Sequence, residues 1–241
     1  MRPSHPLVIA HRGASGYRPE NTVSAFELAV DQRADMIEID LHRARDGAIA
    51  IRHDENFRSL GCNRAISAMD MEEIRKLDAG DGQSVPILEE VLDRFGREVA
   101  FNLELKRGSE GCYPGLEADV LEAVERRGLL GSTLFSSFDD GILERLRALS
   151  SAARLAVLVS PRRSRRSLER ARAIAAESIN PQLGLAVPAL IEAAHADGLA
   201  ILVYTVDAVD DMRRLLNAGV DGLFTNYPDR LRALLETPRG R

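Results

Sequence analysis

Short apolar runs alternate with longer amphipathic stretches along almost the whole chain. The short runs have the length and alternation of β-strands, which predicts strands at residues 7–11, 36–41, 48–53, 99–106, 133–138, 155–160, 177–181, 200–206 and 222–226. Apolar residues at helical spacing predict helices at residues 21–33, 86–95, 115–127, 139–148, 164–176, 186–196 and 208–217. Because helices separate nearly all of these strands, the pattern favours a parallel sheet covered by helices.

Such a sheet is either doubly wound or closed into a barrel. The chain has neither a GxGxxG fingerprint after the first strand nor a Walker A motif. We therefore expect an α/β fold, a (β/α)₈ TIM barrel, built as a single domain from residues 1–241. Residues 55–85 interrupt the alternation with little strand signal and one short helix-like piece, which predicts a small insertion over the barrel rim after the His53-Asp54 pair.

The run MIEIDLH, residues 36–42, places acidic side chains on one face of a strand. Glu38, Asp40 and His42 alternate with three apolar residues, so the apolar set faces the covering helices and the carboxylates face the barrel interior. The Asp-Gly dipeptide at 46–47 then predicts a two-residue hairpin turn. That turn would bring His53 directly opposite Asp40.

A later strand, FNLELK at residues 101–106, has the same alternation and turns Glu104 and Lys106 to the same side. Three carboxylates, from Glu38, Asp40 and Glu104, would repel one another without a cation. Carboxylate oxygens are ligands for hard ions, so we expect these residues to bind a divalent cation, Mg²⁺ or Ca²⁺.

His11 and Arg12 follow the first strand, at the end of a barrel where active sites lie. The planar guanidinium of Arg12 suits a phosphate, and Lys106 supplies a compact positive charge. Lys106 is notable because the chain has 30 Arg and only 2 Lys.

Taken in order, several short motifs resemble the glycerophosphodiester phosphodiesterase family over almost the whole chain. They are HRG (11–13), PENT (19–22), EID (38–40), HD (53–54), LDAG (77–80), PILEEVL (86–92), ELK (104–106) and AGVDGLFTNYPD (218–229). The chain departs from the family pattern after HD, where it reads ENFRSLGCNRAIS, and at Tyr204, where the family usually has Trp.

The resemblance implies a TIM barrel that hydrolyses glycerophosphodiesters to glycerol 3-phosphate and an alcohol with a divalent cation. It also implies site residues: the catalytic pair His11 and His53, the phosphate contacts Arg12 and Lys106, and the metal ligands Glu38, Asp40 and Glu104. The remaining histidines, His5, His42 and His195, lie in no such pair and are interpreted as structural. Asn21 is interpreted as a helix N-cap.

Composition excludes several other functions. The net charge is −5, and the basic run at 161–173 has no interleaved aromatics, so we interpret it as a solvated helix face and expect no nucleic-acid partner. The apolar runs are too short to span a membrane, and the beginning of the chain resembles no secretion signal, so we expect a cytoplasmic protein with free thiols at Cys62 and Cys112.

Two rival functions share the barrel. A related phosphodiesterase acting on lysophospholipids or sphingomyelin would need an apolar acyl-chain surface, of which 5% aromatics give little sign. A non-catalytic protein that binds phosphate ligands would not need both His11 and His53. The sequence does not distinguish Mg²⁺ from Ca²⁺, nor does it identify the headgroup or the oligomeric state.

Overall fold

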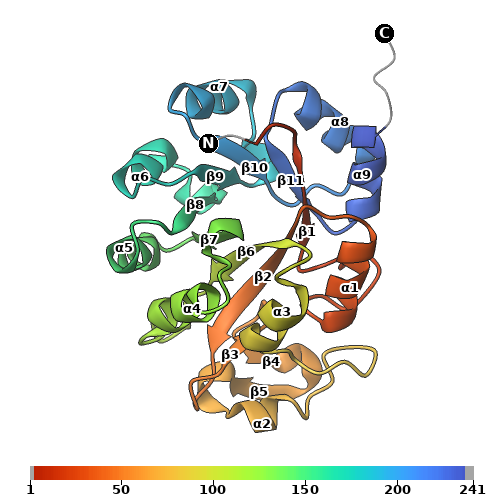
Figure 1. The fold of residues 1–241 in the computed structure, drawn as a ribbon, viewed down its shortest axis with the longest axis vertical. Coiled ribbons are helices and arrows are strands. Elements are labelled where there is room, and N and C mark those ends of the chain that lie inside the picture. The colour runs from red at the N-terminus through yellow and green to blue at the C-terminus, as the bar shows by residue number, and fades with distance from the viewer. Residues whose placement is uncertain (1–2, 237–241) are drawn as a thin grey trace.

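Eight parallel strands close into a barrel in the computed structural model, which describes residues 3–236 (Figure 1). Each strand pairs with the next in the sheet, and the first pairs with both the second and the last, which closes the ring. The strands are β1 (Leu7–His11), β2 (Met36–Arg43), β6 (Ala100–Leu105), β7 (Thr133–Ser137), β8 (Arg154–Val159), β9 (Ser178–Pro181), β10 (Ala200–Val203) and β11 (Gly222–Thr225). The predicted TIM barrel is confirmed.

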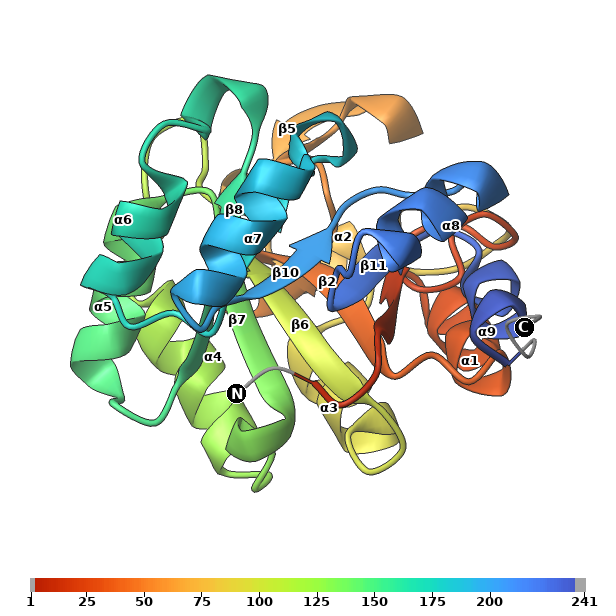
Figure 2. The same ribbon diagram turned by 90° about the horizontal axis from the view of Figure 1, so that it is seen from above.

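Helices surround these strands, as the view from above shows (Figure 2). They are α1 (Val23–Asp31), α3 (Leu88–Phe95), α4 (Leu116–Glu125), α5 (Asp140–Leu149), α6 (Ser167–Ala173), α7 (Pro188–Ala196), α8 (Val209–Asn217) and α9 (Pro228–Glu236). The helix α9 was not predicted from the sequence, although Leu231, Leu234 and Leu235 have helical spacing and pack on the large core. Among residues 3–236, no helix has both the length and the apolarity to cross a bilayer.

The alternation within each strand sorts side chains between two cores. The odd-numbered apolar residues of β2 lie in the large core beneath the helices, together with Leu88 and Val91 of α3. A second, smaller apolar layer fills the barrel interior on the side of the amino ends of the strands. Its members are Ile9, Met36, Leu134, Ala156, Leu202 and Phe224. The inward residues nearer the carboxyl ends of β2 and β6 are polar, whereas Leu158 of β8 and Phe224 of β11 are apolar, and both kinds line the mouth of the barrel.

The hairpin after β2 has a longer turn than the sequence predicted. Its second strand, β3 (Ile49–Ile51), is antiparallel to β2, and three residues separate Ala44 from Ala48. Gly47 adopts φ 92°, the left-handed conformation that closes three-residue hairpin loops and favours glycine. The predicted two-residue turn at 46–47 is therefore wrong by one residue.

This longer turn shifts the pairing of the hairpin. Leu41 lies opposite Ile51. In this register it is Arg52 that comes opposite Asp40, and its backbone N–H donates to the Asp40 carbonyl at 3.0 Å. The prediction that His53 lies directly opposite Asp40 is wrong. His53 instead lies one residue beyond the paired segment.

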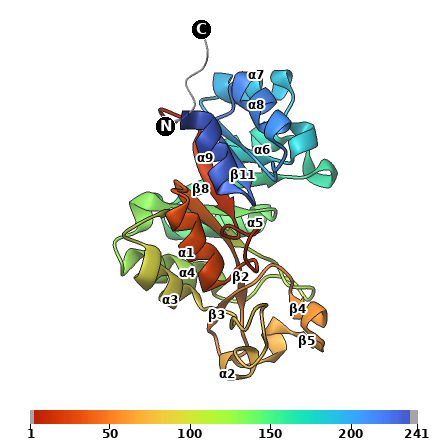
Figure 3. The same cartoon turned by 90° about the vertical axis from the view of Figure 1, so that its right-hand side faces the viewer.

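Residues 55–85 form a small unit at one end of the molecule, where β4 (Asn56–Phe57), β5 (Cys62–Ala65) and α2 (Met71–Ile74) lie together (Figures 1 and 3). The two strands pair with each other rather than with the barrel. Their apolar side chains form a core separate from the large one, and it includes Ala44, Ala50, Phe57, Ile66, Met69, Met71, Ile74 and Val85. The sequence pattern missed both strands because each is only two to four residues long.

Because this unit has its own core, we expect it to open independently of the barrel. Phe57 is fully buried there, so Phe57→Ala should destabilise the unit by about 3–5 kcal/mol. Native-state hydrogen exchange should then show faster exchange in residues 55–85 and unchanged protection in the barrel strands. Phe26→Ala, in the large core, is the matched control and should lower the global free energy of unfolding. Equal loss of protection in both regions after Phe57→Ala would contradict independent opening.

Candidate active site

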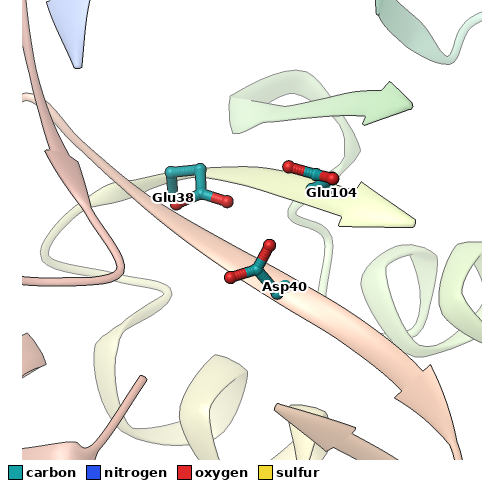
Figure 4. A group of neighbouring side chains, drawn as sticks. All are labelled: Glu38, Asp40 and Glu104. Atoms are coloured by element: carbon teal, nitrogen blue, oxygen red, sulfur yellow. The ribbon is translucent and has the colours of Figure 1, made fainter. Parts of the chain in front are cut away.

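Three carboxylates converge in the mouth of the barrel (Figure 4). Glu38 and Asp40 extend from β2 and Glu104 from β6, and the parallel pairing of these strands places Asp40 beside Glu104. One oxygen from each carboxylate lies within 4.8 Å of the others. The three residues are buried, with exposed fractions of 3%, 1% and 9%. The prediction that Glu38, Asp40 and Glu104 face the barrel interior together is thus confirmed.

Two cations lie against this carboxylate cluster. The Lys106 Nζ atom is 2.9 Å from Asp40 Oδ1 and 2.6 Å from Glu104 Oε1. The Arg12 Nε atom is 3.2 Å from Asp40 Oδ2, and the Arg12 backbone N–H donates to Glu38 Oε2 at 3.0 Å. If all three carboxylates are ionised, one negative charge remains without a positive partner in the cluster.

The excess charge falls mainly on Glu38. Burial raises the pKa of Glu38 well above its ordinary value, and the nearby charges of Asp40 and Glu104 raise it further. Burial also acts to raise the pKa of Asp40, but the charges of Lys106 and Arg12 outweigh burial and hold that pKa below its usual range. The carboxylates are therefore not equivalent, and Glu38 is the one that most needs another positive charge.

The cluster fits a divalent cation. Glu38 Oε1 is buried and has no hydrogen-bond partner anywhere in residues 3–236, which is costly for a polar atom. The donor set consists only of carboxylate oxygens, which suits a hard ion rather than a thiophilic one. A cation among Glu38, Asp40 and Glu104 would supply both the missing partner and the missing charge.

His11, at the end of β1, is fixed by an amide. Its Nδ1 atom is 2.8 Å from Asn226 Oδ1, and Asn226 Nδ2 donates to Asp207 Oδ2 at 2.7 Å. Because a carboxylate accepts hydrogen bonds, the amide nitrogen must face Asp207 and the amide oxygen must face His11. His11 therefore carries its hydrogen on Nδ1 and has a free lone pair on Nε2. Burial, aided by the charge of Arg12, lowers the pKa of His11 to about 4, so the ring is neutral at pH 7.

His53 has a different environment. It lies just beyond β3, its side chain is 39% exposed, and its Nδ1 atom is 2.9 Å from Asp54 Oδ1. A carboxylate in this position accepts the Nδ1 hydrogen, orients the ring and stabilises the imidazolium while the ring holds a proton. Sequence reasoning treated the two histidines as equivalent, whereas the structure gives one an amide partner and the other a carboxylate.

One cavity of about 170 Å³ brings most of the predicted site residues together. Six of the seven line it, namely His11, Arg12, Glu38, His53, Glu104 and Lys106. The seventh, Asp40, contacts the cavity through its ion pairs with Lys106 and Arg12. The rest of the lining is partly apolar or aromatic and partly polar: Phe138, Leu158, Tyr204, Phe224, Asn102, Ser136 and Thr205.

Asn21 donates a hydrogen bond to the carboxylate cluster and does not cap a helix. Thr22 caps α1, since its side chain accepts a hydrogen bond from the Ala25 N–H. Asn21 has φ 57°, and its Nδ2 atom donates to Asp40 Oδ2 at 2.9 Å. The predicted N-cap at Asn21 is therefore wrong by one residue. A left-handed backbone is unfavourable for most residues. At Asn21 it accompanies the hydrogen bond that orients the Asp40 carboxylate.

Sequence reasoning also missed Asn226 and Asp207. Asn226 directly follows β11, so it lies at the same end of the barrel as His11, which ends β1. A polar residue at the carboxyl end of a barrel strand is a usable signal. Asp207 lies in the loop after β10, where it accepts hydrogen bonds from Thr225 and Asn226.

Comparisons with known proteins agree with this geometry. The sequence model of the Glycerophosphoryl diester phosphodiesterase family matches residues 11–230. The Glycerophosphodiester phosphodiesterase of Caldanaerobacter subterraneus subsp. tengcongensis is 33% identical over 93% of this chain and 96% of its own length, and that of Bacillus subtilis is 32% identical over 95% and 86%. An Oleispira antarctica phosphodiesterase, solved with the product sn-glycerol-3-phosphate, superposes with a TM-score of 0.85 at 28% identity, covering 97% of this chain and 98% of that one. The chain belongs to the glycerophosphoryl diester phosphodiesterase family, whose members are phosphoric diester hydrolases.

Proposed function

We propose that this protein hydrolyses glycerophosphodiesters to glycerol 3-phosphate and an alcohol through acid-base catalysis by His11 and His53. The observation that carries the proposal is the convergence, at one barrel mouth, of three buried carboxylates, two cations and two differently partnered histidines. The Oleispira antarctica phosphodiesterase, whose product is sn-glycerol-3-phosphate, supports the same product here.

In this proposal Glu38, Asp40 and Glu104 hold a divalent cation, Mg²⁺ or Ca²⁺. When bound, the cation supplies electrostatic stabilisation of negative charge on the phosphate. Arg12 and Lys106 line the same cavity and would donate to the phosphoryl oxygens, so that positive charge surrounds the phosphorus as negative charge builds up.

The different partners of the two histidines support different roles for them. His11 is neutral with a lone pair on Nε2, so it takes the proton of the attacking hydroxyl as general base. The new oxygen–phosphorus bond forms while the bond to the leaving alcohol breaks. His53, supported by Asp54, donates its Nε2 proton to the leaving alkoxide.

Two nucleophiles fit this assignment. Direct attack by water gives glycerol 3-phosphate in one step. Attack by the 2-hydroxyl of the glycerol gives a cyclic phosphate, which water then opens with the two histidines exchanging roles. Detection of a cyclic phosphate in single-turnover reactions would select the second route.

The shape of the cavity indicates the class of substrate. A volume of about 170 Å³ can hold a glycerol phosphate group, and a lysophospholipid would have to leave its acyl chain outside. We infer that the substrates are deacylated, water-soluble diesters. This agrees with the cytoplasmic location that the sequence predicts.

The proposed function is tested by glycerol 3-phosphate release from glycerophosphocholine with and without a chelator. We expect turnover with Mg²⁺ or Ca²⁺ and its loss in excess chelator, with recovery when the ion is restored. Circular dichroism should show that the fold persists throughout, since the two apolar cores of the barrel do not include the carboxylates. Undiminished release in excess chelator would exclude the metal-dependent reaction.

The acid-base assignment is tested by changing the leaving group. The choline alkoxide is a poor leaving group that needs a proton, whereas nitrophenolate leaves without one. His53→Ala should therefore cost about 10²-fold or more in kcat/KM with glycerophosphocholine and much less with a glycerol nitrophenyl phosphodiester. His11→Ala should be equally damaging with both esters, and His5→Ala, at an exposed position, is the silent control. Recovery of the His11 variant instead of the His53 variant would reverse the roles.

A further inference from the structure

His42 comes two residues after Asp40 in β2, yet it is not among the side chains that line the cavity. It is buried, with 2% of its surface exposed, and both ring nitrogens have partners. Its Nε2 atom is 3.1 Å from the His53 carbonyl oxygen, and its Nδ1 atom is 2.8 Å from the Tyr113 hydroxyl. The rings of His42 and Tyr113 also meet edge to face, with centroids 5.6 Å apart.

The chemistry of the partners gives these hydrogen bonds a direction. The His53 carbonyl only accepts, so the His42 Nε2 atom carries the hydrogen and donates it. In the neutral ring Nδ1 then has a lone pair, which accepts from the Tyr113 hydroxyl. A directed chain therefore runs from the Tyr113 hydroxyl through His42 to the backbone of His53.

His53 needs such support because the sheet does not reach it. β3 ends at Ile51, and the Arg52 N–H makes the last backbone hydrogen bond to β2, at the Asp40 carbonyl. The bond from His42 is therefore the contact that ties the His53 carbonyl to the barrel.

A second tie lies close by. Glu55 Oε1 accepts hydrogen bonds from the Ser109 backbone N–H at 2.7 Å and from the Ser109 hydroxyl at 2.6 Å. Ser109 and Tyr113 both belong to the loop between β6 and α4, so this one loop contacts the His53 backbone through His42 and the chain after His53 through Glu55. The first residue of this loop is Lys106, which directly follows β6.

We propose that His42 and Tyr113 are positioning residues for His53. They hold its backbone so that its ring meets the leaving alkoxide, although neither side chain lines the cavity. The proposal rests on the proposed function, in which His53 is the general acid. A small displacement of a catalytic group can lower the rate greatly. Loss of one hydrogen bond between Tyr113, His42 and His53 should therefore slow the step in which His53 protonates the leaving group.

The decisive variant is Tyr113→Phe, which removes one hydroxyl and keeps the buried ring. We expect kcat/KM for glycerophosphocholine to fall about five- to tenfold, the worth of one hydrogen bond, and that for the nitrophenyl diester to change less than about twofold. His53→Ala is assayed beside it as the reference for a lost acid. Tyr17→Phe is the matched control, because the Tyr17 hydroxyl bonds Asp229 on α9 instead.

A second pair of variants guards against misfolding. Gln at position 42 has an amide that can donate to the His53 carbonyl, whereas Leu cannot. His42→Gln should therefore retain more activity toward glycerophosphocholine than His42→Leu, while the two variants hydrolyse the nitrophenyl diester at similar rates. If the His42 variants do not fold, the Tyr113→Phe comparison alone decides.

Two results would overturn the proposal in distinguishable ways. If Tyr113→Phe lowers kcat/KM equally for both esters, the hydroxyl stabilises the site as a whole and does not position the acid. If His53→Ala itself loses the same factor in kcat/KM with both esters, His53 is not the general acid, and the positioning role fails with that assignment.

Discussion

The repulsion among three buried carboxylates is the constraint on which the rest of the site depends. Glu38, Asp40 and Glu104 have oxygens within 4.8 Å of one another where little water can separate them. Coulomb repulsion at such distances is strong when solvent is excluded, so the chain places Arg12 and Lys106 against Asp40 and Glu104. These contacts leave Glu38 Oε1 without a hydrogen bond in residues 3–236. This deficit suits the site to a cation, which is the basis for proposing that Glu38, Asp40 and Glu104 hold one.

The barrel supplies the rigidity that such a cluster requires. Paired backbone positions in β2 and β6 fix the separation of Asp40 and Glu104, and the apolar faces of the same strands are locked beneath the helices. The histidines, by contrast, lie at strand ends where the sheet gives less support. Side chains replace it there: Asn226 and Asp207 fix His11, while His42 and Tyr113 hold the segment of His53.

The alternation of apolar and polar residues was enough to predict the barrel and the inward-facing carboxylates. It worked because buried parallel strands sort their side chains strictly between interior and helices. The failures occur where backbone conformation departs from the regular strand or helix. Gly47 lengthens the hairpin turn by one residue, and the left-handed conformation of Asn21 moves the helix cap to Thr22.

The partners of the histidines could not be predicted for another reason. Asn226 lies 215 residues from His11, and Tyr113 lies 71 residues from His42. No local pattern links such pairs, because each contact depends on how loops from different strands meet at the barrel mouth. Recognition of motifs therefore identified candidate site residues, six of which line one cavity, but not the side chains that orient them.

The most direct test of this account measures stability rather than activity, using the free energy of unfolding as Mg²⁺ or Ca²⁺ is added. If a cation completes the carboxylate cluster, the wild-type protein should gain about 2.7 kcal/mol at an ion concentration a hundred times its dissociation constant. Glu38→Gln should lose most of this gain, whereas Lys106→Met, which keeps all three carboxylates, should retain it. An unchanged stability of the wild-type protein, or the same gain in Glu38→Gln, would contradict the account.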